Sequence, residues 1–194
     1  MYELQTTVNI NGASFGIRNK GDFRMVLDCF KELNNPELDG AERLYIALII
    51  FYEDFNDLDD IRKHSDILDE LRKQMFIFFD GGDEVLQSNT GNHRLLDWDK
   101  DSTMICSAIN PIANKEIRDT RYLHWWTFLG YYMAIGESLL SHVISIRYKI
   151  ATGKKLEKHE QQFRQQNPQY FNIDMRSIEQ KEADDYIKQL WGNA

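Results

Sequence analysis

Apolar and polar residues alternate along the first part of the chain, and this two-residue period is typical of a β-strand. The pair Asn11-Gly12 interrupts the alternation, and Asn-Gly favours the positive backbone dihedrals of a two-residue hairpin turn. We therefore predict a small β-hairpin with strands over residues 2–10 and 13–18. Because an isolated hairpin is only marginally stable in water, we expect it to pack against another part of the chain.

From Asp22 onward the apolar residues recur at helical spacing. The first predicted helix begins at Asp22, whose carboxylate can cap it, and ends at the Asn-Asn-Pro sequence of residues 34–36. A second helix is predicted from about Asp39 to Phe51, and the acidic run Glu53 to Asp60 follows it. A third is predicted from about Leu58 to Phe79. We expect these three helices to form an antiparallel set.

A change in composition follows this region. Residues 81–93 are rich in Gly, Asn, Ser and Asp, which predicts the main loop between an N-terminal hairpin-and-helix region, 1–80, and a C-terminal helical region, 94–173. Helical spacing resumes from about Asp97 to Ile109, and we expect Pro111 to open a short connection to the next helix.

The stretch from Arg121 to Leu140 reads RYLHWWTFLGYYMAIGESLL. Successive residues of a helix point about 100° apart, so His124, Trp125 and Trp126 would sweep over half of its circumference. A single core-facing stripe cannot cover all three. The sequence therefore predicts a central helix with neighbours on most of its sides, or the face of something larger, interrupted at Gly136.

The remaining residues predict further helices. One runs over Val143 to Ile150, with Ser138 or Ser141 as its start and Thr152-Gly153 as its end. The polar segment that follows, KKLEKHEQQFRQQN, is either a solvated helix or a contact surface. Residues 174–194 form a C-terminal amphipathic segment, which we treat as an appendage. The predicted fold is therefore mainly α, a domain of about six to eight helices with a small N-terminal β-hairpin.

Bulk properties support a folded intracellular protein. A chain of 194 residues buries roughly 70% of its unfolded surface, which suffices for a core without disulfides. The longest apolar run, Ala47 to Tyr52, is far shorter than the roughly 20 residues of a membrane span. Cys29 and Cys106 lie in helical patterns, and we interpret them as free core thiols of a cytosolic protein.

The charge is acidic and uneven. The net charge of −8 argues against sequence-independent binding to nucleic acid, which needs a surplus of Lys and Arg. Residues 1–110 hold 11 basic and 21 acidic side chains, whereas residues 111–194 hold 12 and 10. The two halves could attract each other, or two copies of the chain could.

No motif of catalysis or cofactor binding is present in the sequence. The glycines lack the spacing and the lysine of a phosphate loop, and the run from Glu53 to Asp60 lacks the pattern of a calcium loop. Metal binding is disfavoured because the five histidines are scattered singly. His124 is the best catalytic candidate, but no nucleophile or acid is recognisably placed to act with it, so we favour a core histidine with satisfied ring nitrogens. We expect no cofactor and no enzymatic activity.

Two groups of residues are candidates for binding a partner. Aromatic side chains dominate both cores and interfaces, so sequence alone does not divide these two roles. A basic stretch with Glu157 as its only acid favours an acidic partner surface, with phosphate as the alternative. The candidate partner-binding or core residues are His124, Trp125, Trp126, Phe128, Arg147, Lys149, Lys154, Lys155 and Lys158.

Five blocks occur in an order that resembles a known family. They are DFR at 22–24, NPEL at 35–38, RLLDWDKD at 94–101, LHWWTF at 123–128 and SIRYKIATGKKLEKHEQQF at 145–163. This pattern resembles the bacteriophage gene-product-fifteen family of long-tailed phages and prophages of Gram-positive hosts. The resemblance covers roughly residues 1–173.

The resemblance implies a non-enzymatic role in phage tail morphogenesis. Such proteins are encoded near the tape-measure protein and are similar in gene position to tail assembly chaperones, which keep that protein soluble in the host cytoplasm. The implied partners are the tape-measure protein and other tail proteins, with self-association as a further expectation and neither nucleic acid nor membrane. The alternative is a minor structural tail or connector component of the virion. The family carries over no catalytic residues.

Overall fold

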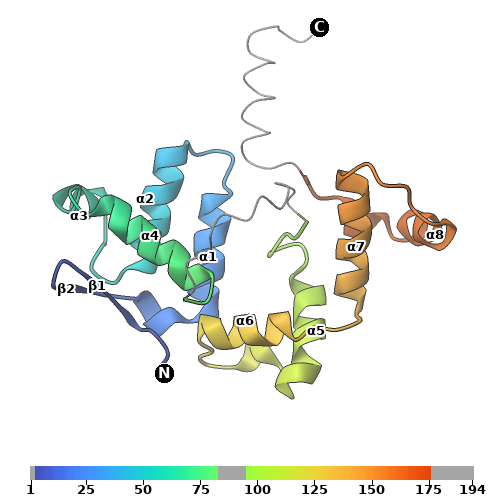
Figure 1. The fold of residues 1–194 in the computed structure, drawn as a ribbon, viewed down its shortest axis with the longest axis horizontal. Coiled ribbons are helices and arrows are strands. Elements are labelled where there is room, and N and C mark those ends of the chain that lie inside the picture. Colours follow the sequence, from blue (N-terminus) through green and yellow to red (C-terminus); the bar gives the residue numbers. More distant parts are fainter. Residues whose placement is uncertain (1–2, 83–94, 176–194) are drawn as a thin grey trace, which may run out of the picture. The chain divides into compact units, whose positions relative to one another are not determined.

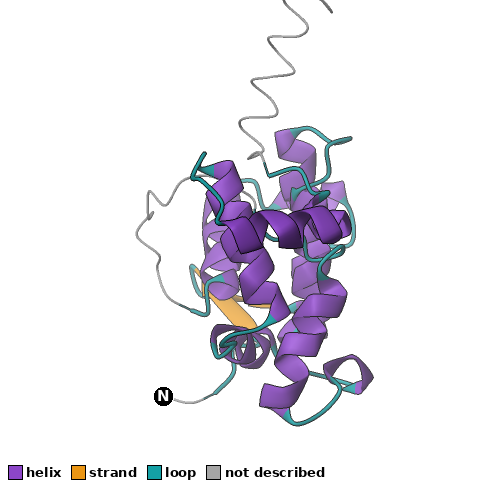
Figure 2. Cartoon of the chain, turned by 90° about the vertical axis from the view of Figure 1, so that its right-hand side faces the viewer, coloured by secondary structure: helices purple, strands orange, loops and turns teal. Residues whose placement is uncertain are grey.

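The computed structural model describes residues 3–82 and 95–175, which form eight α-helices, three 3-10 helices and one two-stranded sheet (Figure 1). These described residues fall into two compact units. Unit 1 contains 3–82 and 116–134, and unit 2 contains 95–115 and 135–175. Helices dominate both units, and the hairpin supplies the only strands in the described ranges (Figure 2). The predicted fold class, mainly α with a small N-terminal hairpin, is confirmed.

The hairpin pairs β1 (Thr7–Ile10) with β2 (Ala13–Gly16) in antiparallel register. Asn11 and Gly12 both have positive φ, 51° and 84°, so the predicted turn is confirmed, although the strands are shorter than predicted. The hairpin is anchored in unit 1. The Gly16 carbonyl accepts from the Glu53 backbone N–H at 2.8 Å, and the Gly16 N–H donates to the Asp54 carboxylate at 2.8 Å.

The first two helices begin where their capping residues predicted. Asp22 accepts from the Arg24 N–H at the start of α1 (Phe23–Leu33), and Asp39 forms a capping box with Glu42 at the start of α2 (Gly40–Phe51). The two helices pack against each other, and Cys29 is completely buried between the side chains of the core. Burial raises the pKa of this thiol, which keeps it protonated.

The third predicted helix, Leu58 to Phe79, is wrong as a single element. The structure has two helices there, α3 (Leu58–Lys63) and α4 (Leu68–Phe79), separated by turns. The His64 ring nitrogen Nδ1 binds the Asp60 carbonyl at 2.9 Å, while the backbone N–H of His64 bonds only three residues back, to Ile61. This tightened turn ends α3, even though the apolar spacing continues across it.

Unit 1 is completed by the 3-10 helices η1 (Arg18–Gly21) and η2 (Ile117–Asp119) and by α6 (Trp125–Met133). Its core is aromatic, and the rings of Phe23 and Phe128 stack with centroids 4.7 Å apart. The helix is shorter than the Arg121–Leu140 stretch suggested, and it is not covered on all sides, since Met133 is 72% exposed.

Unit 2 contains α5 (Ser102–Ala113), α7 (Leu139–Ala151), α8 (Lys158–Gln166) and η3 (Pro168–Phe171). Both ends of α5 differ from the predicted Asp97–Ile109. The Asp97 carboxylate accepts from the backbone N–H groups of residues 99 and 100, so a turn precedes the helix. Pro111 lies inside the last turn, and Asn114 in the left-handed conformation ends the helix.

The other predicted ends in unit 2 are confirmed. Ser138, one of the two predicted starts, forms a capping box with Ser141, and Thr152 caps the end of α7 before Gly153 at φ 68°. Cys106 is buried, and neither it nor Cys29 forms a disulfide bond. The predicted loop 81–93 and the C-terminal segment 174–194 lie almost entirely outside the described residues. Within the described ranges, no helix is long and apolar enough to cross a membrane.

Candidate functional site

His124 lies in the core of unit 1, with 1% of its surface exposed, at the position that caps α6. Its Nδ1 accepts from the Trp126 backbone N–H at 3.1 Å, which leaves Nε2 as the donor to the Gln5 carbonyl at 2.9 Å. Burial lowers the pKa of His124, although the Gln5 carbonyl and Asp22 oppose this. The ring is therefore a neutral helix cap whose two nitrogens are both engaged, as favoured from the sequence.

The two tryptophans bind the C-terminal end of α4. The indole N–H of Trp125 donates to the Phe79 carbonyl at 2.8 Å, and that of Trp126 donates to the Phe78 carbonyl at 2.9 Å. These are the last two residues of α4, where helix carbonyls lack partners within the helix. The His-Trp-Trp block thus caps the start of α6 and the end of α4 together. Trp125 is completely buried, whereas Trp126 is partly exposed.

A second polar centre in unit 1 joins α1 to the segment before α6. The buried Asp22 carboxylate accepts from the backbone N–H groups of Arg24 and Leu123, the latter at 2.9 Å. The Arg24 guanidinium binds Asp22 and donates to the carbonyls of Ile117, Arg118 and Thr120. Sequence reasoning missed this role of Arg24, because its only signal was its place in the DFR block.

Arg147, a candidate for partner binding, lies instead in the interior of unit 2. It is completely buried and forms a bidentate pair with Asp101 at 2.6 and 2.8 Å. It also donates to the carbonyls of Leu95 and Tyr170, each at 2.9 Å. One guanidinium therefore holds α7, the start of α5 and η3 together, and it is not available to a partner.

Lys149 is also engaged within unit 2. Its ammonium group binds the Glu160 carboxylate at 2.6 Å and connects α7 to α8. Lys149 and the Glu157 backbone N–H hold the pKa of Glu160 below its usual range. The basic stretch read from the sequence is therefore not one continuous surface, since two of its five members point into the fold.

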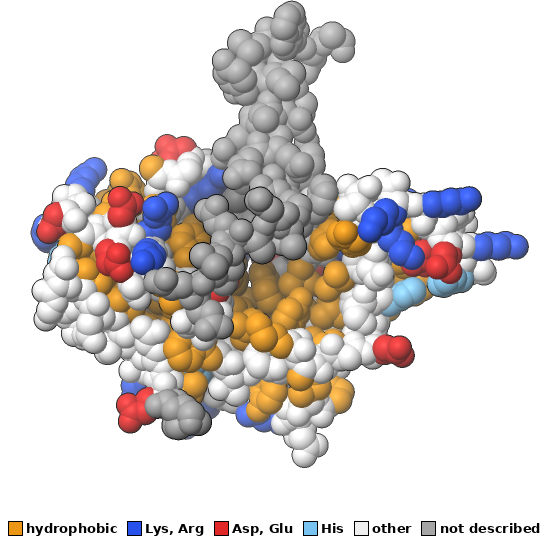
Figure 3. All heavy atoms as spheres, viewed as in Figure 1, with side chains coloured by type: hydrophobic (Ala, Val, Ile, Leu, Met, Phe, Trp, Pro, Cys, Tyr) orange, Lys and Arg blue, Asp and Glu red, His pale blue; other side chains and the backbone are white. Residues whose placement is uncertain are grey.

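The other three basic candidates are exposed. Lys154, Lys155 and Lys158 lie around the start of α8, and positive side chains gather on this part of unit 2 in Figure 3. Lys154 lies over the Tyr148 ring at 4.7 Å. Arg164, which the sequence reasoning did not single out, is a fourth exposed cation and, like Lys158, lies on α8.

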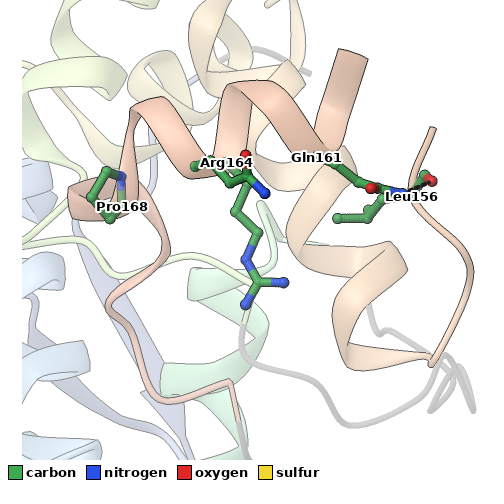
Figure 4. A pocket seen from close by; sticks show the side chains of 5 residues that line it. Leu156, Gln161, Arg164 and Pro168 are labelled. Atoms are coloured by element: carbon green, nitrogen blue, oxygen red, sulfur yellow. Dashed lines mark hydrogen bonds between the residues drawn. The ribbon is translucent and has the colours of Figure 1, made fainter. Parts of the chain in front are cut away.

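A pocket of about 520 Å³ lies beside these cations. Its walls belong to α8 and the residues on either side of that helix (Figure 4). In Figure 4 the guanidinium of Arg164 extends from α8 between Pro168 on one side and Leu156 on the other. The lining residues are Leu156, Gln161, Arg164, Gln165 and Pro168. The pocket thus combines two apolar side chains with three that donate hydrogen bonds.

A family model described as Bacteriophage Gp15 protein matches residues 1–172 of the chain. The chain belongs to the bacteriophage Gp15 family. Searches of curated proteins and of solved structures found no match. The range that matches this phage family contains both units' polar centres and the α8 pocket.

The described residues of this Gp15-family chain show how its chemically distinctive side chains are used. Among them, every buried side-chain nitrogen and oxygen has a hydrogen-bond partner, and no group of three or more His, Cys, Asp or Glu residues is placed to hold a metal. His124, Trp125 and Arg147 all cap helices or bind backbone carbonyls. The exposed cations and the pocket on α8 are therefore the candidate site, because their charges and hydrogen-bond donors lie at the surface.

Proposed function

We propose that the chain is a non-enzymatic phage tail morphogenesis protein, an assembly chaperone that binds the tape-measure protein, other tail proteins, or both, in the host cytoplasm. The observation that carries the proposal is the family match over residues 1–172, which makes this a phage protein. The site supports it because the exposed cations around the α8 pocket are suited to a protein partner with acidic side chains.

The chemistry of the α8 surface favours a helical partner segment. An apolar side chain of a partner helix could fill the pocket, and acidic side chains next to it on that helix would contact the exposed cations around the pocket. Lys155, Lys158 and Arg164 form no ion pair with any residue between 95 and 175, so a partner's carboxylates would not compete with an existing bond there. Binding of this kind is steered by charge and weakens with salt.

The first experiment is co-expression with the tape-measure protein of the same phage, followed by measurement of the tape-measure protein in the soluble fraction. We expect the wild-type chain to keep it soluble, and Lys154→Glu, Lys155→Glu and Lys158→Glu combined to reduce that soluble amount. The matched control reverses three exposed lysines elsewhere, Lys20, Lys31 and Lys115. A tape-measure protein that precipitates equally with and without the wild-type chain would contradict the proposal.

The alternative role, a minor tail or connector component, differs in where the protein ends up. A chaperone leaves before the particle is complete, whereas a structural component stays. Mass spectrometry of purified virions therefore separates the two roles, and finding this chain at fixed stoichiometry in finished virions would favour the structural one.

A further inference from the structure

The pocket on α8 has the chemistry of a receptor for an apolar side chain flanked by carboxylates. Leu156 and Pro168 supply apolar walls, while Gln161, Arg164 and Gln165 supply donors. Lys158 precedes Gln161 by three residues and Gln165 by seven, so all three lie on one face of α8. A cation therefore lies on the same face of α8 as two of the pocket's donors.

The exposed cations around the pocket carry charge that the described fold does not neutralise. Lys149 shows the contrast, because it is paired with Glu160, whereas Lys155, Lys158 and Arg164 have no acidic partner within unit 2. Glu157 is the one exposed acid on the same helix end, and it lies 3.4 Å from His159. The surface around the pocket is therefore positive, and it should attract a binding segment that carries acidic side chains.

Unit 1 of the same chain carries a side chain of matching chemistry. Leu58, the first residue of α3, is 45% exposed and stands between Asp57 and Asp59 in the acidic run Glu53 to Asp60. Of the large apolar side chains that are exposed in residues 3–82 and 95–175, Leu58 alone has a carboxylate on both sides. Arg62 pairs with Asp59 at 2.8 Å and Lys63 with Asp60 at 2.9 Å, whereas Asp57, on the other side of Leu58, pairs with no cation in the described residues. Three acids of the run therefore remain in excess.

We propose that Leu58 of one copy inserts into the α8 pocket of a second copy, with Asp57 and the other acids of the run that lack a cationic partner against Lys155, Lys158 and Arg164. The two surfaces are different parts of the chain, so the contact is head to tail. In a pair of copies, one copy still has an empty pocket and the other still has an unbound Leu58. Further copies can therefore bind at both ends of the pair. This inference goes beyond the proposed function, because it requires only the chain itself.

The self-association is measured by sedimentation velocity on the full chain, with no other protein present, at about 50 mM and about 500 mM salt. We expect the mean mass to rise with concentration from about 1 to about 200 µM at the lower salt, and this rise to move to at least tenfold higher concentration at the higher salt. A wild-type chain that stays at 22.9 kDa throughout would overturn the proposal.

Two variants separate the two halves of the contact. Lys155→Glu with Lys158→Glu blocks the pocket and leaves Leu58 intact, whereas Leu58→Lys blocks the insertion and leaves the pocket intact. Each variant alone should remain monomeric. An equimolar mixture should form a complex of twice 22.9 kDa and no larger, because each chain in it has one working surface.

A control variant and a substitute variant accompany this measurement. Met133→Lys changes another exposed apolar residue and should associate as the wild type does. If Leu58→Lys fails to fold by circular dichroism, Glu53→Lys with Asp59→Lys replaces it, since both side chains are exposed. A mixture that stays monomeric, or a Leu58→Lys chain that associates as strongly as wild type, would refute the contact. Both inferences use Lys155 and Lys158, so the lysine reversals do not separate them. Leu58→Lys does, because it should abolish self-association and leave the α8 surface able to keep the tape-measure protein soluble.

Discussion

Replacing Arg147 with alanine should lower the free energy of unfolding of unit 2 more than any substitution of an exposed residue does. Asp101 is 2% exposed, and Arg147→Ala would leave its carboxylate buried without the bidentate pair. Breaking a buried pair from one side costs about 3–5 kcal/mol. The carbonyls of Leu95 and Tyr170 lose their donors in the same variant, which places the expected loss in the upper part of that range.

This loss is large beside the stability of an ordinary domain, about 5–15 kcal/mol. We would measure it by urea denaturation at neutral pH, with hydrogen exchange of α5 and α7 as the local readout. Arg147→Lys keeps the charge but not the planar fork, so its effect should be intermediate.

The matched control is Arg72→Ala, because Arg72 pairs with Asp69 at 3.4 Å in an exposed position. Its effect should lie at about 0–1 kcal/mol, as for surface pairs in general. An Arg147→Ala chain that lost as little stability as Arg72→Ala, or that kept wild-type protection of the α5 and α7 amides, would contradict a structural role for the buried pair.

Three further predictions concern unit 1. Burial lowers the pKa of His124, so the unfolded chain takes up a proton at a higher pH than the folded chain does. The free energy of unfolding should therefore fall as the pH drops below about 6.5. Denaturation series at several pH values should show a flatter dependence for His124→Asn. Trp125→Ala should cost about 3–5 kcal/mol, and Trp126→Ala clearly less because that ring is partly exposed, which calorimetry of the two variants compares. Gly21→Ala should destabilise the chain, because φ is 76° and a Cβ there would lie 2.7 Å from the Phe78 ring; a midpoint equal to wild type would contradict this.

The sequence predicted the helix starts that depend on local chemistry. Asp22, Asp39 and Ser138 cap helices because their side chains bind backbone N–H groups two or three residues away, and such bonds need no tertiary contact. The Asn11-Gly12 turn was predictable for the same reason. The break after α3 was not, because the His64 ring binds a backbone carbonyl within an apolar pattern that continues unbroken.

The roles of the candidate residues depend on tertiary structure, and sequence could only partly predict them. Arg147 stands in a run of cations, yet it points inward to Asp101, which is 46 residues away. Arg164 completes the pocket with no motif to mark it, because the pocket exists only when α8 and η3 are folded. The division between buried and exposed cations is set by long-range contacts, which periodicity does not encode.

The proposed binding of this chain to the tape-measure protein as an assembly chaperone is tested most directly by the mass of the complex that the two proteins form. The two proteins are co-expressed, and the molar mass of the soluble complex is measured by light scattering during size-exclusion chromatography. We expect a soluble complex with several copies of this chain per tape-measure protein, and fewer copies after reversal of Lys154, Lys155 and Lys158. An insoluble tape-measure protein beside a chain that elutes alone would contradict it.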